Sequence, residues 1–197
     1  MRNNRYSLIL PVSLIFLLFS LGACRNPEQA SPYMVGQVID SLNGVYVYYN
    51  GKVGNVSGRN LTADNYNLGQ KYQCVEFVKR YYYEYFDHKM PDSYGHAKDF
   101  FDANIKDGQK NLKRDLIQHT NPGSSKPKAN DLLVFGGTLF NRYGHVAIIA
   151  EVGDDSIQII QQNPGPDRNS REWIPFIQQN GQWYIDNKRV MGWLRKE

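Results

Sequence analysis

The sequence predicts an α+β domain in which a helix precedes an antiparallel sheet. Two observations lead to this prediction. Residues 73–87 are amphipathic with the period of a helix, whereas residues 131–195 contain several short apolar runs bounded by turn-forming residues. A helical segment that comes first and strands that come afterwards indicate the α+β class.

The first 23 residues, MRNNRYSLILPVSLIFLLFSLGA, have the pattern of an export signal. Arg2 and Arg5 supply a basic start, residues 8–21 form an apolar run, and Leu-Gly-Ala precedes Cys24. This end resembles the bacterial lipobox, at which the peptide is cut before a cysteine that then carries lipid. The alternative is an uncleaved transmembrane anchor, but the run is shorter than the roughly 20 residues that span a bilayer. We expect residues 1–23 to be removed and lipid on Cys24 to hold the protein on the extracytoplasmic side of a membrane, either the periplasmic side or the cell surface.

After the signal, the chain is predicted to contain a short tether, residues 24–43, and one domain, residues 44–197. The tether includes the polar segment RNPEQASP, which contains two prolines. Removal of 23 of the 197 residues leaves 174, which is enough for one sizeable hydrophobic core.

Charge and cysteine content narrow the class of protein. Loss of Arg2 and Arg5 lowers the formal net charge from +4 to +2, and no basic run is interleaved with aromatic residues, so nucleic acid is not an expected partner. Once Cys24 carries lipid, Cys74 has no disulfide partner in the chain. A lone thiol in an oxidising compartment is expected to be buried or used in chemistry.

The first half of the domain is predicted to contain a strand, a loop and a long helix. Residues 45–49, VYVYY, predict a strand, and a loop rich in glycine and asparagine follows over residues 50–70. The helix is expected to end near Asp87. Its apolar and aromatic face carries Cys74, Phe77, Val78, Tyr81 and Tyr85. Another face carries the charge pairs of Glu76, Arg80 and Glu84.

The second half of the domain is predicted to be mainly strands. A further helix is expected over residues 95–104, and the polar connection over residues 121–130 has no predicted shape. The last strands are expected to form a closing antiparallel pair around Asp186 and Asn187. The predicted strand segments are 131–135, 145–152, 156–163 and, for the closing pair, 182–195.

The hairpin that begins at His145 can be laid out from its turn. If Gly153–Asp155 forms a three-residue loop, Val152 pairs with Ser156 and His145 lies opposite Asn163. Side chains across such a pair lie about 5 Å apart on one face of the sheet. We therefore expect the amide of Asn163 to fix the tautomer of His145 and to leave its other ring nitrogen free to act as a base.

Two glutamines lie close to that predicted pair. Gln161 is the diagonal neighbour of His145 on the same face, about 7 to 8 Å away. A register slip of one residue would place Gln162 beside the histidine instead.

Cys74 lies at the predicted helix start, where a thiol is either a buried structural group or a nucleophile. Unpaired N–H groups and the helix dipole favour an anion there, and a nearby imidazolium lowers the thiol pKa further. The same N–H groups are placed to hold the oxyanion of an acyl-transfer reaction. A cysteine, a base and an orienting group at positions 74, 145 and 163 follow the logic of cysteine hydrolases, which favours catalysis.

Six segments resemble, in order and spacing, the blocks of the CHAP family, the cysteine, histidine-dependent amidohydrolases and peptidases. They are YQCVEFVKRYY, GHAKDFF, KPKANDLLVF, YGHVAIIAEV, IIQQN and GWLR. The likeness covers roughly residues 44–195 and is close to the amidase domain of bifunctional glutathionylspermidine synthetase/amidases. It implies a papain-like fold, in which a helix that carries the nucleophile packs on an antiparallel sheet that carries the histidine.

Carried over position by position, the resemblance implies that Cys74 is the nucleophile and His145 the general base. After the cysteine and the histidine, the family has an acidic third site residue, and Asn163 matches the asparagine two positions after it. At the acidic position itself, this sequence has Gln161 where many relatives have glutamate. A neutral amide can orient an imidazole but cannot stabilise the imidazolium by a full charge. The sequence also has Asn130 where the family usually has a glycine before the aspartate.

We therefore expect a lipid-anchored cysteine amidase or endopeptidase that cleaves amide bonds through a thioester on Cys74. His145 acts as base and then as acid, Asn163 orients it, and Gln161 gives secondary polar support. The N–H of Cys74 is expected to hold the oxyanion, and Gln73 to shape the same pocket. No cofactor is implied. No metal site is proposed, because the other histidines lie in polar loops or at helix ends without a second cysteine or an acidic cluster nearby.

The expected extracytoplasmic location favours the peptide part of peptidoglycan as the substrate. One alternative is an amidase that acts on a small peptide-polyamine conjugate, as the resemblance suggests and the export signal argues against. The other is a non-catalytic lipoprotein that binds the cell wall or a partner and keeps the fold, for which Gln161 is the motivating residue.

Overall fold

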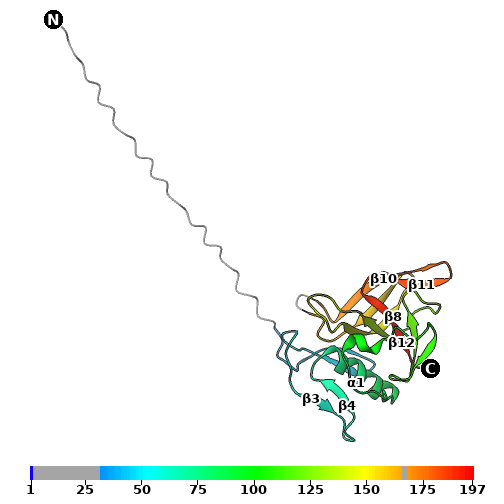
Figure 1. Cartoon of the computed structure of the whole chain (residues 1–197). Coiled ribbons are helices and arrows are strands. Elements are labelled where there is room, and N and C mark those ends of the chain that lie inside the picture. Colours follow the sequence, from blue (N-terminus) through cyan, green and yellow to red (C-terminus); the bar gives the residue numbers. More distant parts are fainter. Residues whose placement is uncertain (2–31, 166–167) are drawn as a thin grey trace. The chain divides into compact units, whose positions relative to one another are not determined.

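An eight-stranded antiparallel sheet and the α-helix that packs on it form most of the fold in the part of the chain from residue 32 onwards (Figure 1). The computed structural model describes Met1, residues 32–165 and residues 168–197. The predicted signal peptide and Cys24 lie outside these described residues. Within them, no helix has the length and apolar character needed to cross a membrane. The α+β class is confirmed.

The large sheet has the strand order β11-β10-β9-β8-β7-β12-β6-β5, and every neighbouring pair is antiparallel. Two small sheets, β1-β2 and β3-β4, lie outside it. The elements in chain order are β1 (Val38–Leu42), β2 (Val45–Tyr48), β3 (Arg59–Leu61), β4 (Asn67–Gln70), α1 (Cys74–Phe86), the 3-10 helix η1 (Ala97–Phe100), β5 (Gln109–Asn111), β6 (Leu116–Thr120), β7 (Leu132–Phe135), β8 (His145–Val152), β9 (Ser156–Ile160), β10 (Arg171–Gln179), β11 (Gln182–Ile185) and β12 (Val190–Arg195).

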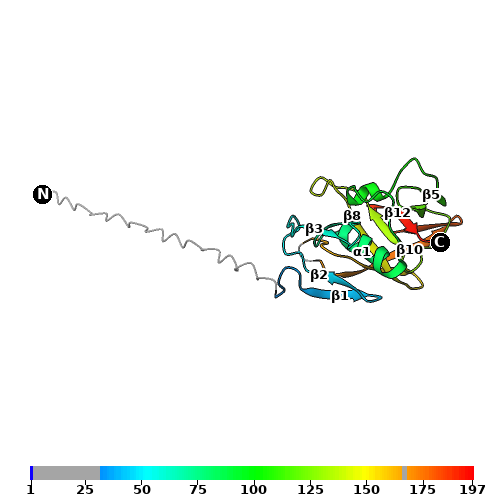
Figure 2. The ribbon, with the colours of Figure 1, turned by 90° about the horizontal axis from the view of Figure 1, so that it is seen from below.

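The helix α1 forms close to where its periodicity predicts it and packs against β8, β4 and β2 (Figure 2). It ends at Asp87, which takes the left-handed conformation with φ 49° and donates its N–H to the carbonyl of Tyr82. The predicted apolar face is buried at its centre, but Tyr85 is 45% exposed. The predicted charged face differs more, because both Glu76 and Arg80 are buried.

Both faces of the sheet are buried at its central strand β7, which explains why the sequence of β7 is a continuous apolar run. Leu132 and Val134 pack with the apolar residues of α1, whereas Leu133 and Phe135 belong to a second cluster on the other face. Each fully buried side chain of this kind stabilises the fold by roughly 1.5 to 3 kcal/mol relative to an exposed one. A strand covered on both sides therefore has no polar alternation.

One departure from the family pattern has a backbone explanation. Asn130, which takes the place of the usual glycine, has a positive φ of 74°. Glycine adopts this conformation without penalty, and asparagine tolerates it better than most residues do. The side-chain oxygen of Asn130 also accepts a hydrogen bond from the hydroxyl of Tyr81 at 2.6 Å, so it ties this turn to α1.

Several predicted elements need correction. The helix predicted over residues 95–104 is reduced to the short η1, and the predicted closing pair is wrong. β11 pairs with β10, whereas β12 lies between β7 and β6. Residues 38–42, predicted as tether, form β1 and pair with β2. Six strands were not predicted: β1, β3, β4, β5, β6 and β10. Most of these are short and polar, and their pairing is decided by segments far away in the chain.

Candidate active site

Cys74 is the first residue of α1, and its sulfur lies at the start of β8. The residue before it, Gln73, is extended with φ −84° and ψ 161°, so the helix begins abruptly at the cysteine. Backbone N–H groups of Val146, Val75 and Cys74 itself lie close enough to the thiol to lower its pKa. Because Val146 directly follows His145, the fold brings the two predicted catalytic residues to neighbouring parts of α1 and β8.

The thiol is nevertheless not activated in the resting protein. Burial raises the pKa of the Cys74 thiol above its ordinary value of 9.0, and this effect outweighs the three N–H groups, which lower it. The N–H groups at the helix start lower the pKa of this thiol as predicted, but the net shift is upward. Desolvation of the anion is the stronger influence at this position, so the resting group is a neutral thiol.

A glycine sets the position of His145. Gly144 has φ 77°, and a Cβ atom there would lie 2.5 Å from the carbonyl oxygen of Phe135. Only glycine fits this close approach between the turn and β7. His145 then pairs with Phe135 across the ladder, and the two rings lie 5.8 Å apart between centroids. The imidazole is thus held by packing on one side and by the strand.

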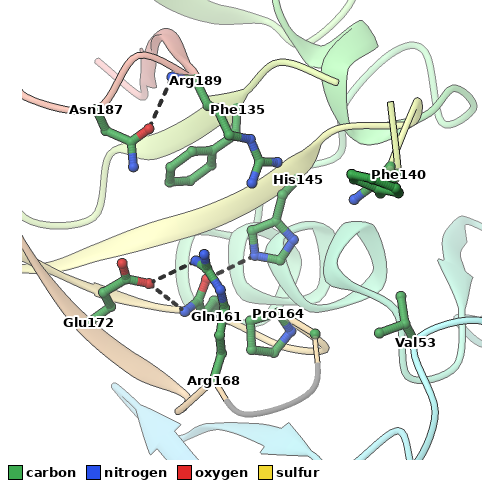
Figure 3. A pocket seen from close by; sticks show the side chains of 12 residues that line it. Val53, Phe135, Phe140, His145, Gln161, Pro164, Arg168, Glu172, Asn187 and Arg189 are labelled. Carbon is green, nitrogen blue, oxygen red and sulfur yellow. Dashed lines mark hydrogen bonds and ion pairs between the residues drawn. The ribbon is translucent and has the colours of Figure 1, made fainter. Parts of the chain in front are cut away.

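The amide of Gln161 orients the imidazole (Figure 3). His145 Nε2 lies 3.0 Å from Gln161 Oε1. The amide nitrogen of Gln161 donates to the carbonyl of Asn169 at 3.2 Å and lies 3.5 Å from Glu172 Oε2. Because these two acceptors fix the amide nitrogen on the far side, the oxygen faces the ring. The neutral imidazole therefore carries its proton on Nε2 and keeps Nδ1 free as an acceptor.

Burial makes His145 a weak base. It lowers the pKa of the imidazole from 6.5 to about 4, although the hydrogen bond to Gln161 raises it. The charges of Arg189 and Arg168 lower the pKa further. A neutral thiol and a neutral imidazole therefore coexist at neutral pH, and the ion pair forms only when a reaction moves the proton.

Asn163 does not contact the histidine as predicted, although the register of the hairpin is close to the expected one. Near the turn, Val152 pairs with Ile157 and not with Ser156, but a bulge beyond Glu151 restores the expected pairing of Ile149 with Ile159. β9 then ends at Ile160. The chain leaves the ladder before it reaches Asn163.

The consequence is a change of orienting residue. Asn163 has φ 53°, and its amide nitrogen donates to Gln73 Oε1 at 2.8 Å and to the carbonyl of Val53 at 2.9 Å. The partner of His145 is therefore Gln161, in the position predicted only for secondary support. Asn163 instead fastens the segment after β9 to the residue that precedes the cysteine.

Gln73 has a similar structural task. Its amide nitrogen donates to the carbonyls of Asn55 and Val53, at 2.8 Å and 3.2 Å, and its oxygen accepts from Asn163. With these partners, the side chain has no donor left for an oxyanion. Gln73 does not line the pocket itself, but it supports the loop around Val53, which does.

A buried polar network that sequence reasoning missed joins the helix start to the end of β9. Gln162 is fully buried, and its amide nitrogen donates to Glu76 Oε2 at 2.8 Å and to the carbonyl of Gln73 at 3.0 Å. Its oxygen accepts the N–H of Tyr48 at 2.8 Å. Glu76 also pairs with Arg80 at 2.6 Å. The i, i+4 spacing of this ion pair is visible in the sequence, but its burial is not.

A pocket of about 290 Å³ opens beside the imidazole (Figure 3). It is lined by Val53, Phe135, Phe140, Asn141, His145, Gln161, Pro164, Gly165, Arg168, Glu172, Asn187 and Arg189. Within residues 32–165 and 168–197, no three histidine, cysteine or carboxylate side chains gather in a way that could hold a metal ion.

Comparisons with known proteins identify a family to which the chain is similar. The family model described as CHAP domain matches residues 64–163, which include Cys74, His145 and Gln161. Trypanothione synthetase of Crithidia fasciculata is 36% identical over 107 residues, which cover 54% of this chain and 16% of that protein. The bifunctional glutathionylspermidine synthetase/amidase of Escherichia coli K12 is 28% identical over 147 residues, which cover 69% of this chain and 23% of that protein.

The chain thus spans less than a quarter of the length of these curated relatives. A solved structure of the wild type endolysin LysIME-EF1 aligns with a TM-score of 0.38 and 22% identity, over 74% of this chain and 59% of that one. A TM-score this low does not establish a shared fold.

Proposed function

The chain belongs to the CHAP family, and on this premise we propose that it is a cysteine amidase or endopeptidase with Cys74 as the nucleophile. The observation that carries the proposal is the junction of α1 and β8, where the sulfur meets the N–H of Val146, next to His145. The orientation of the imidazole by Gln161 leaves Nδ1 as the proton acceptor. A nucleophile-bearing helix on an antiparallel sheet is also the papain-like arrangement that the resemblance implies.

The proposed reaction begins with transfer of the thiol proton to Nδ1 of His145 as the sulfur attacks the amide carbon. The carbonyl oxygen becomes an oxyanion, and the N–H of Cys74 at the open helix start is its proposed donor. The imidazolium then gives its proton to the leaving amine, and a thioester remains. Water, deprotonated by the same imidazole, hydrolyses the thioester and regenerates the thiol.

Gln161 determines how costly the proton transfer is. A neutral amide accepts the Nε2 proton and fixes the tautomer, but it adds no negative charge to stabilise the imidazolium. Asparagine performs this task in papain-like enzymes. The amide therefore does not argue against catalysis, and we expect it to lower the rate relative to a carboxylate.

We further propose that the substrate is the peptide part of peptidoglycan and that the protein is held outside the cytoplasm by lipid on Cys24. The export pattern of residues 1–23 supports the location, and peptidoglycan is the extracytoplasmic polymer that contains accessible amide bonds. To test the anchor, the wild type and a Cys24→Ala variant are expressed and their membrane fractions compared. Mass spectrometry of the N-terminal peptide of the membrane-bound wild type then decides: lipid on Cys24 supports the anchor, whereas an unmodified Cys24 contradicts it.

A second candidate is an amidase acting on a peptide-polyamine conjugate, because the relatives include glutathionylspermidine synthetase/amidase. The charge of the pocket argues against a polyamine beside the histidine. Among the described residues that line it, Arg168 and Arg189 are accompanied by one carboxylate, that of Glu172. A cationic polyamine placed there meets like charges, which disfavours binding.

The deciding experiment incubates the full chain, purified in detergent, with sacculi and, in parallel, with glutathionylspermidine. New amino groups and released peptides are measured by mass spectrometry. The wild type is expected to release peptides from sacculi, and the Cys74→Ala and His145→Ala variants are expected to release none. Cleavage of the polyamine conjugate alone selects the second candidate. Binding to sacculi without any release selects a non-catalytic wall-binding protein.

A further inference from the structure

Two arginines line the pocket beside His145, and one carboxylate accompanies them. Arg168 lies in the segment between β9 and β10, and Arg189 directly precedes β12, so two distant parts of the chain supply the charges (Figure 3). Glu172 of β10 is the acidic residue among those that line the pocket. With His145 neutral, the described residues of this lining carry two positive charges and one negative charge, a formal sum of +1.

Both guanidinium groups keep donors available. Arg168 Nη1 lies 3.4 Å from Glu172 Oε2, and the two side chains are 53% and 39% exposed, so their ion pair is loose. Arg189 Nη2 donates to the carbonyl of Gly136 at a long 3.4 Å. The Nε of Arg189 is buried and has no acceptor within the described part of the chain. Because this atom is closed to solvent, the donors of Arg189 that a ligand in the pocket could reach are those of its terminal Nη groups.

We propose that Arg189 and Arg168 bind a carboxylate of the substrate that lies next to the scissile amide. This assignment rests on the proposed function, because it identifies the substrate side of the same site. Guanidinium groups present paired N–H donors that match the two oxygens of a carboxylate. Peptides carry such groups at their chain ends and on acidic side chains, so an anionic peptide satisfies both the pocket charge and the reaction.

The bound carboxylate also favours the chemical step. The charges of Arg189 and Arg168 oppose the imidazolium that forms when His145 takes the proton of Cys74. A substrate carboxylate bound between the two arginines offsets their positive charge at the imidazole, and it stays bound in the transition state. A substrate that lacks the carboxylate therefore loses kcat as well as affinity, which distinguishes this role from simple docking.

The test uses the full chain in detergent with soluble disaccharide peptides released from sacculi, before and after amidation of their carboxyl groups. Amidation is expected to lower kcat/KM of the wild type by roughly 10- to 100-fold, the range for loss of hydrogen bonds to a charged group. Arg189→Met and Arg168→Met are each expected to lose about 10-fold on the native peptides and little on the amidated ones. Arg189→Lys is expected to recover part of the loss.

A matched control separates this role from a general effect of charge. Lys188 is exposed, directly precedes Arg189 in the chain and does not line the pocket, so Lys188→Met removes a positive charge outside the site. It is expected to cleave both peptides like the wild type. Equal cleavage of native and amidated peptides by the wild type overturns the carboxylate site and leaves the proposed function standing. Equal losses on both peptides in the arginine variants overturn it as well.

Binding to the inactive Cys74→Ala protein, measured by calorimetry, keeps the two proposals separate. If no peptide is cleaved but the native peptide binds more tightly than the amidated one, the carboxylate site stands and the proposed function fails. If nothing is cleaved and binding does not depend on amidation, both fail.

Discussion

Replacement of Gln161 by glutamate tests the proposed catalytic geometry most directly. The substitution keeps the size of the side chain and places a carboxylate oxygen where the amide oxygen now lies, 3.0 Å from His145 Nε2. At a charge separation of about 4 Å and an effective dielectric constant of about 20, the attraction to an imidazolium is about 4 kcal/mol. Gln161 is only 2% exposed, so desolvation of the new carboxylate offsets much of this attraction.

A second cost comes from Glu172. Its carboxylate oxygen lies 3.5 Å from the amide nitrogen of Gln161, and in the variant this contact becomes a repulsion between two carboxylates. A net stabilisation of the imidazolium by about 1.4 to 2.7 kcal/mol remains, which corresponds to a pKa increase of about 1 to 2. The pKa of His145 is about 4 in the wild type, so we expect it to rise to between about 5 and 6 in Gln161→Glu.

The pH dependence of kcat/KM on peptide substrates measures this change, and NMR titration of the ring measures it independently. We expect turnover near neutral pH to be retained or raised. Asn163→Asp is the matched control, because it adds the same charge two residues away, where the side chain contacts Gln73 and not the imidazole. A shift of the His145 pKa in Asn163→Asp but not in Gln161→Glu would refute the assignment of the orienting residue.

Three further substitutions test what holds the site in place. Gly144→Ala should lower the free energy of unfolding, measured in urea, and the activity by more than Gly181→Ala does. Both glycines have φ near 77°, but only at Gly144 would the added Cβ lie 2.5 Å from a backbone oxygen. The control Gly181→Ala therefore carries only the conformational cost of about 1 to 2 kcal/mol. Glu76→Gln removes the close carboxylate partner of the buried Arg80 guanidinium and should lower the free energy of unfolding by about 3 to 5 kcal/mol. Glu84→Gln changes the longer pair with the same Arg80, at 4.0 Å and 46% exposed on the Glu84 side, and should change the free energy of unfolding by less than about 1 kcal/mol. Burial lowers the pKa of Lys79 from 10.5 to about 7. The unfolded chain therefore holds this proton more tightly, and the free energy of unfolding should rise by about 2 kcal/mol between about pH 7 and pH 9. Lys79→Met should remove that rise in the free energy of unfolding. If the variant keeps the same dependence on pH, the rise does not come from Lys79.

Local patterns in the sequence predict the parts of the fold whose cause is local. The helix from Cys74 to Phe86 follows from a 3.6-residue period, and β7 and β8 follow from apolar runs that begin after turn residues. Cys74 and His145 could be singled out because each lies at the start of such an element. The pairing of β12 between β7 and β6 has no local signal, so the predicted closing hairpin was wrong.

The sequence by itself determined which groups are available for catalysis, since a thiol at a helix start and a histidine at a strand start are set by short-range periodicity. Only the tertiary structure decided how these groups are tuned. The chain leaves the ladder after Ile160, so Gln161 and not Asn163 meets the imidazole. Burial, which depends on every element packed around the site, raises the pKa of the thiol and lowers that of the imidazole. Packing of distant segments likewise placed Arg168 and Arg189 at one pocket, because electrostatic and desolvation effects act through space and not along the chain.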